Sequence, residues 1–367
     1  MASHVPFLAV RPEEQASPEI KLRDTTKPRR SSKATKAQTV VKKAEEEVKK
    51  TARKARNFLD HLRFPLVLIL SLSLRLAAYT LVAEWAGLEL ASVSRDLRKD
   101  WQVGAVLTWK VLELIGVWWA EYDWIDLASL SLLSNLPFYF LLSSFYQLSG
   151  LSIGTSLTID IVSLTLPFIL LRSHVRSTRD EDLLRPLGRA VAHDYQILAL
   201  TSVLAAVVFG ATLYISFASW LPVHMIEHFD NLRTLDIAHD SNIYKLAGLF
   251  VPAGLAAMHF LFLPTVSASN SLLSALDSVT KDAPFDPESA TLLQTIAYNF
   301  GLKEEMSAKT EVLFKRTAVL ALGSAINTFV RVFATIDGAE ASGALGWAAL
   351  WAGAISFVGV VFRWVAE

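Results

Sequence analysis

The chain of 367 residues contains no cysteine. Disulfides, thiolate zinc sites and cysteine nucleophiles are therefore excluded, although this absence fits both oxidising and reducing compartments. The chain also lacks an Asn-x-Ser/Thr sequon, a P-loop and a dinucleotide-binding glycine fingerprint. We therefore expect a protein that is not an enzyme and that holds no cofactor.

Charged residues are scarce and unevenly placed. They make up 19% of the chain against 52% hydrophobic residues, whereas a soluble domain usually carries about 25% charged residues. From Met1 to Arg63 there are 16 Lys and Arg residues against 8 Asp and Glu residues. Since the whole chain has a net charge of zero, this basic head precedes an apolar body with an excess of acid. Such a head favours anionic lipid or acidic protein over a specific nucleic-acid site.

Long apolar stretches indicate membrane spans. A helix needs roughly 20 apolar residues to cross the hydrocarbon core. The sequence predicts about eight such spans, near residues 64–86, 102–120, 127–148, 153–172, 195–220, 246–266, 317–336 and 344–362.

The stretch 102–120 is the weakest of these, because Lys110 and Glu113 lie one helical turn apart within it. It crosses the membrane or lies along the interface. With eight spans and cytosolic termini, 27 Lys and Arg residues fall inside and five outside, as the positive-inside rule requires. We therefore expect an all-α, polytopic transmembrane helix bundle with both termini cytosolic.

This threading divides the chain into five parts: a disordered basic tail (1–36), a charged amphipathic helix (37–63), spans one to six (64–266), a cytosolic helical loop (267–316) and spans seven and eight (317–367). Residues 37–63 carry a weak heptad of small apolar residues, typical of a partner helix, a helix on anionic headgroups or a solvated helix. We expect protein partners to dock on 37–63 and 267–316, and membrane lipids to surround the spans.

Polar residues inside the predicted spans are the candidate site: Arg75, Lys110, Glu113, Asp160, His259, Asn327 and Arg331. A central arginine costs about 2.5–3.5 kcal/mol on insertion scales, so it should face protein or water. These residues either line an ion or substrate path or form static pairs. The static hypothesis, which we favour, pairs Lys110 with Glu113, Arg75 with Asp160, and Arg331 with a neighbouring subunit.

Small residues in span eight indicate close helix packing. Ala344, Ala348, Ala352 and Ser356 recur every four residues, and Ala349 and Gly353 follow the same spacing. Such small-xxx-small patterns let a second helix approach. The partner is span seven or, in a homo-oligomer, another copy.

The letters HMIEH at 224–228 match the His-x-x-Glu-His signature of one zinc metalloprotease class. His224 and His228 would share a helical face as ligands, with Glu227 as the general base. However, Pro222 precedes the motif and the following loop is too short for a substrate cleft. We interpret the motif as an amphipathic interfacial stretch.

Together these features predict a non-enzymatic membrane scaffold or complex subunit in a eukaryotic-type endomembrane, with the endoplasmic reticulum or nuclear envelope favoured. A transporter or channel using the intramembrane charges is the alternative, and a zinc peptidase a remote one.

Overall fold

The computed structural model describes residues 62–95, 100–171, 194–268 and 308–366. In these ranges the regular structure is helical, with no strand, so the predicted all-α class is confirmed. Eight helices are long and apolar enough to cross a membrane. The expected tail (1–36) and most of the amphipathic helix (37–63) lie outside the described residues.

The eight long helices follow the predicted order. They are a first helix (Leu62–Leu81), α3 (Asp100–Ala120), α4 (Trp124–Ser144), α5 (Gly150–Leu171), α8 (Tyr195–Ala218), the continuous run of α12 (Val251–Ala257), η3 (Met258–Phe262) and α13 (Leu263–Ala268), α16 (Ala308–Thr335) and α17 (Ala341–Ala366). The stretch 102–120, ambiguous in sequence, is thus one helix of spanning length.

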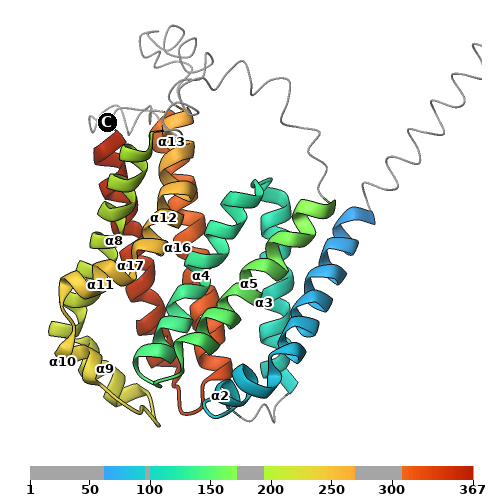
Figure 1. Cartoon of the computed structure of the whole chain (residues 1–367), viewed down its shortest axis with the longest axis vertical. Coiled ribbons are helices and arrows are strands. Elements are labelled where there is room, and N and C mark those ends of the chain that lie inside the picture. Colours follow the sequence, from blue (N-terminus) through green and yellow to red (C-terminus); the bar gives the residue numbers. More distant parts are fainter. Residues whose placement is uncertain (1–61, 96–99, 172–193, 269–307, 367) are drawn as a thin grey trace, which may run out of the picture. The chain divides into compact units, whose positions relative to one another are not determined.

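Shorter helices connect the long ones. The helices η1 (Ala83–Gly87), α2 (Leu88–Ala91), α9 (Leu221–His228) and α10 (Asp236–Asp240) lie at one end of the bundle, whereas α11 (Ile243–Leu249) packs beside the middle of α8. We call this end the loop end. The first helix begins, and α17 finishes, at the opposite end of the bundle (Figure 1).

Two predicted boundaries need correction. The sixth span starts at Val251 and not near residue 246, because Pro252 stands in the first turn of α12 and separates it from α11. The helix of the seventh span starts at Ala308 and includes residues 308–316, which we expected to belong to the helical loop before the span. Glu311 and Lys315 form an i,i+4 ion pair there, which supports helix on an exposed face. The rest of the expected 267–316 loop lies outside the described residues.

An aromatic cluster forms the core between α4, α8, α11 and α17. Trp347 and Trp351 of α17 are almost fully buried, and both contact Phe140 of α4. The Trp347 indole N–H donates to the carbonyl of Pro137 at 3.0 Å, so its polar atom is satisfied inside the apolar core. Phe209 of α8 packs against the same cluster.

The small residues of span eight divide between two faces. Ala344 and Ala348 are buried, whereas Ala349 and Gly353 are exposed. A Cβ added to Gly359 would lie 2.6 Å from Thr317 Cγ2 of α16. Span seven is therefore a packing partner of span eight, and the exposed face leaves the homo-oligomer prediction open.

Backbone contacts join the loop end. Ser94 pairs with Ile336, and Phe229 pairs with Ala339, as isolated bridges. Gly338, at φ +75°, turns the chain between α16 and α17, a conformation that glycine adopts without steric strain. Arg95 adds hydrogen bonds from its guanidinium to the carbonyls of residues 333 and 339. The connections after the first helix, α9 and α16 therefore hold one another in place.

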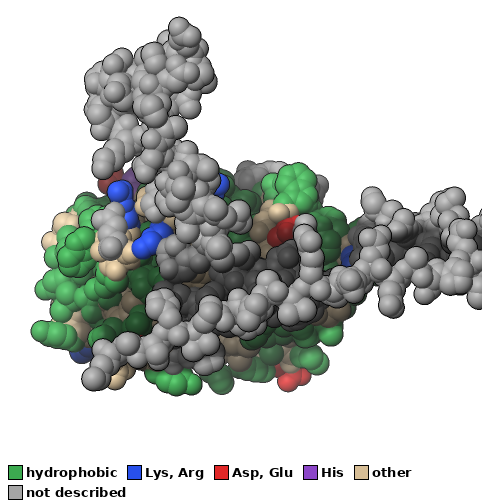
Figure 2. Space-filling model, turned by 90° about the horizontal axis from the view of Figure 1, so that it is seen from above, with side chains coloured by type: hydrophobic (Ala, Val, Ile, Leu, Met, Phe, Trp, Pro, Cys, Tyr) green, Lys and Arg blue, Asp and Glu red, His purple; other side chains and the backbone are tan. Residues whose placement is uncertain are grey.

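The sides of the bundle are apolar. Figure 2, viewed from the end where α17 finishes, shows a predominantly hydrophobic rim with few charged side chains. Strongly exposed apolar side chains occur on several long helices, among them Leu76, Leu170, Leu200, Leu322 and Val360. A monomeric soluble protein rarely exposes such a continuous apolar surface, but a lipid-facing one requires it.

The closest helix approach provides a test of this packing. A Cβ on Gly254 of α12 would lie 2.0 Å from the carbonyl oxygen of Ser202 in α8. We expect Gly254→Ala to destabilise the bundle by about 1–3 kcal/mol through overpacking. Gly353→Ala is the matched control, because nothing lies within 4 Å of its Cβ position. Thermal unfolding in detergent should therefore separate the two variants, and equal midpoints would contradict the described α8–α12 contact.

Candidate functional site: a buried charge network

Six of the seven intramembrane polar residues predicted from the sequence lie in one region. Arg75, Lys110, Glu113, Asp160, Asn327 and Arg331 come from the first helix, α3, α5 and α16. They surround one face of α4, whose polar side chains complete the network. His259 lies apart, on η3.

Asp160 of α5 is the centre of the network, and its side chain is fully buried. Oδ1 accepts from Arg75 Nη2 at 2.7 Å and from the Tyr79 hydroxyl at 3.2 Å. Oδ2 accepts from Arg331 Nη1 at 2.8 Å and from the Tyr139 hydroxyl at 2.8 Å. A carboxylate offers about four lone-pair sites, so these four donors satisfy it completely.

The Arg75–Asp160 pair expected from the sequence is thus present. The expectation that Arg331 pairs with a neighbouring subunit is wrong, because its guanidinium reaches Asp160 of the same chain. Position 331 lies on the face of α16 that turns toward α4 and α5, and its side chain is 9% exposed.

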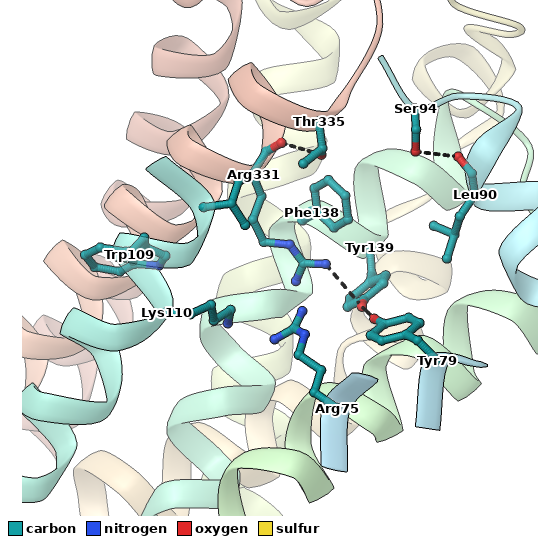
Figure 3. A pocket seen from close by; sticks show the side chains of 11 residues that line it. Arg75, Tyr79, Leu90, Ser94, Trp109, Lys110, Phe138, Tyr139, Arg331 and Thr335 are labelled. Atoms are coloured by element: carbon teal, nitrogen blue, oxygen red, sulfur yellow. Dashed lines mark hydrogen bonds between the residues drawn. The ribbon is translucent and has the colours of Figure 1, made fainter. Parts of the chain in front are cut away.

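Arg331 is held by α4 as well as by Asp160. Its Nη1 donates to Asn135 Oδ1 at 2.6 Å, and its Nη2 donates to the Tyr139 hydroxyl at 3.2 Å. The guanidinium carbon lies 4.0 Å from the ring centroid of Phe138, within the range of a cation–π contact. Figure 3 shows Arg331 reaching past Phe138 toward Tyr139. One arginine therefore fixes α16 against α4 and α5.

A chain of amide contacts extends the network to α3. Asn327 Nδ2 donates to the Ser134 carbonyl at 2.8 Å and to Asn135 Oδ1 at 3.1 Å. In return, Asn327 Oδ1 accepts from the Trp109 indole at 2.9 Å. Buried polar groups stabilise a fold only when they are paired, and this set is paired across three helices.

Lys110 and Glu113 of α3 form the second ion pair, with Nζ 2.7 Å from Oε2. This intrahelical pair agrees with the static hypothesis. Both side chains are mostly buried, at 13% and 12% exposure. The pair lies beside Arg75 and Asp160, since all four side chains line a small cavity of about 20 Å³.

A second network lies toward the opposite end of the bundle, and sequence reasoning missed it. Arg316 of α16 donates to Asp126 of α4 at 2.9 Å and to the Phe260 carbonyl at 3.0 Å. Its guanidinium also lies 5.1 Å from the Tyr122 ring centroid. His259, half-buried, shares the π-helical turn with Phe260. Arg316 was missed because residue 316 was assigned to a loop.

Other members of the main network were also missed: Tyr79, Trp109, Asn135 and Tyr139. Asn135 had a usable signal, because an amide inside an apolar span needs a partner. The tyrosines and the tryptophan had none, because such residues occur commonly in spans as apolar or interfacial side chains.

HMIEH forms most of helix α9, with Pro222 in its first turn, so the proline starts this helix and does not interrupt it. His224 and His228 share a face, with ring centroids 4.7 Å apart. His228 Nδ1 lies 2.9 Å from Glu340 Oε2, whereas Glu227 is exposed. In the ranges that the structure describes, His, Asp and Glu residues form no group of three that could hold a metal ion. The two histidines instead pack α9 against the start of α17.

One further match to a catalytic motif lies in the letters GLSIG at 150–154, which have G-x-S-x-G spacing. A nucleophile elbow is a strained strand-to-helix turn with an exposed serine. Here the stretch is the start of α5, and Ser152 is 2% exposed with its hydroxyl 3.0 Å from Ser149 Oγ. The sequence therefore matches the G-x-S-x-G motif, but the structure does not form a nucleophile elbow.

Comparison with known proteins gives one family. The profile of the Bouquet formation protein 3 C-terminal domain matches residues 194–330, from the N-cap of α8 into the last turns of α16. The match covers well under half of the chain, and it includes Asn327 but ends one residue before Arg331. No curated protein and no solved structure matches the chain.

The network predicts that two cations of α16 contribute very differently to the free energy of unfolding. Arg331→Met leaves Asp160 with one fewer cation, and we expect a loss of about 3–5 kcal/mol in the free energy of unfolding, as for other broken buried pairs. Lys315→Met is the control, since its exposed pair with Glu311 should contribute about 0–1 kcal/mol. Denaturant titration in detergent micelles measures both values. Equal losses in the free energy of unfolding would show that Arg331 does not stabilise the fold through Asp160.

The burial of His224 predicts that the stability of the protein depends on pH. Burial lowers the pKa of His224 below its usual value, so the fold favours the neutral ring. The stabilisation is then complete above the unfolded pKa of about 6.5 and is lost as pH falls through the folded pKa. We expect a lower Tm at pH 5 than at pH 8, and His224→Phe should reduce this difference. His239→Gln, at an exposed position of α10, should leave the difference unchanged, and the same change in both variants would contradict this assignment.

Proposed function

We propose that the chain is a non-enzymatic membrane scaffold, or a subunit of an endomembrane complex. The observation that carries this proposal is the saturation of Asp160 by four donors from three helices. A carboxylate in that state has no lone pair left for a travelling cation or proton. Asp160 therefore acts as a fixed structural contact, which favours a static role over transport.

The family match supports a structural role and a location. The name of the matching family refers to bouquet formation and not to a reaction. That name is compatible with the nuclear envelope, one of the two membranes that we favour from the sequence. From the eight candidate spans of the described residues, we assign both termini to one side of the membrane, the cytosol or nucleoplasm.

The docking surfaces are proposed from charge and pattern. Residues 37–63 combine basic residues with a weak heptad, which suits an acidic or helical partner. The 267–316 segment lies within the family match and supplies a second surface on the same side. A further copy of the chain can approach α17 at Ala349 and Gly353, both exposed.

The scaffold proposal predicts a partner that depends on the tail. Full-length protein, purified from native membranes in mild detergent, should retain a stoichiometric protein partner. A variant that lacks residues 1–59 should lose that partner while the bundle keeps its Tm, because the bundle forms a compact unit from Asp60 onward. Quantitative mass spectrometry of both preparations measures the ratio.

Two charge variants sharpen this experiment. Replacing Lys42, Lys43, Lys49 and Lys50 by Gln should release the partner if docking is electrostatic, whereas replacing the same four by Arg should retain it. A homo-oligomer without any protein partner, in both the full-length and the shortened form, would contradict the scaffold proposal.

A further inference from the structure

A cavity of about 210 Å³ lies beside the main network, between the first helix, α2, α3, α4 and α16. It extends from Arg75 and Lys110, in the middle of their helices, to Ser94 and Thr335 at the loop end. Since a water molecule occupies roughly 30 Å³ in the liquid, the cavity has room for a phosphate group with several waters.

The lining of this cavity is strongly positive. Arg75, Lys110 and Arg331 all line it, together with the side chains of Tyr79 and Tyr139. Figure 3 shows the charged ends of the three cations converging on one space. No acidic residue is among the described residues that line it. Asp160 and Glu113 line the smaller cavity of about 20 Å³, which shares Arg75 and Lys110 with the larger one.

The charge count leaves one cation in excess. Among the residues that the structure describes around the cavity, three cations share two carboxylates, since Asp160 pairs with both arginines and Glu113 pairs with Lys110. One net positive charge therefore remains in a low-dielectric region, where an unpaired charge is costly. An anion in the larger cavity would neutralise it.

Hydrogen-bond donors remain for such an anion. Within the described chain, the Arg75 guanidinium donates to Asp160 through Nη2, and Lys110 Nζ donates to Glu113. A guanidinium has five N–H donors and an ammonium has three. Both groups can therefore keep their present partners and also donate to a phosphate oxygen.

The remaining walls are apolar and border the lipid. Leu90, Val106, Trp109 and Phe138 line the cavity. The first helix and α3, which flank it, each have only 11% of their spanning residues buried. The cavity reaches from the middle of these helices to the loop end, so a lipid whose headgroup lies at that end can place its phosphate in the cavity while its acyl chains stay in the bilayer.

We propose that this cavity is a phosphate-binding site, filled by the headgroup of an anionic membrane lipid or by free phosphate. Arg75, Lys110 and Arg331 bind the phosphate oxygens, and the phosphate neutralises the one positive charge that the two carboxylates leave uncompensated. This site is independent of the proposed docking surfaces.

The test uses a matched pair of variants in the full-length chain. Glu113→Gln removes the ion pair of α3 but keeps Lys110, so phosphate binding should be retained or strengthened. Lys110→Gln combined with Glu113→Gln removes the same pair and also the cation. Since a charged hydrogen bond contributes about 1.5–3 kcal/mol, we expect affinity to fall by about tenfold or more in the double variant.

Binding is measured as the shift of Tm in lipid nanodiscs, in two arms. One arm compares phosphatidylcholine discs with discs that also contain phosphatidic acid. The other adds inorganic phosphate to phosphatidylcholine discs at constant ionic strength. Stabilisation by phosphatidic acid alone identifies the lipid source, and stabilisation by inorganic phosphate identifies the free anion. The basic tail attracts anionic lipid in every variant, so only the difference between the two variants reports on the cavity. No stabilisation in either arm, or equal stabilisation of the two variants, would overturn the proposal.

Discussion

The buried carboxylate of Asp160 is the constraint on which the arrangement of the N-terminal helices depends. An ionised carboxylate inside an apolar bundle is unstable unless cations and hydrogen-bond donors surround it. Arg75 and Arg331 supply the cations from opposite ends of the sequence. Because each guanidinium must lie within hydrogen-bond distance of one carboxyl group, the first helix, α5 and α16 can adopt only one relative register. Apolar packing alone would tolerate small rotations of these helices, whereas directional hydrogen bonds do not.

Helix α4 connects this polar region to the aromatic core. Asn135 and Tyr139, one turn apart, turn toward Arg331, while Phe140 turns toward Trp347 and Trp351. Most of α4 is therefore buried although it carries several polar side chains. Its polar face is specified by hydrogen bonds, and its opposite face is specified by ring packing. This division explains why a helix with almost no preferred apolar face lies in the centre of the bundle.

The sequence predicts the spans well and the network only in part. Span number and order follow from length and hydropathy, which are local properties, and the described helices agree within a few residues except where Pro252 and the segment 308–316 shift a boundary. Most of the buried polar residues could also be predicted from the sequence, because a charged residue inside a span needs a partner. The pairing of these residues was harder to predict, because it depends on how each helix is rotated about its axis. Arg331 and Arg316 show this, because their partners are 171 and 190 residues away in the sequence.

The first helix depends strongly on the network. Few of its spanning residues are buried, so apolar contacts contribute little to its attachment, and lipid can replace many of them. Its directional contacts come from Arg75 and Tyr79, which reach Asp160 from the same face. The cavity that carries the surplus positive charge lies against that same face. An anion bound there would contact Arg75 and Lys110 together and would join the first helix to α3.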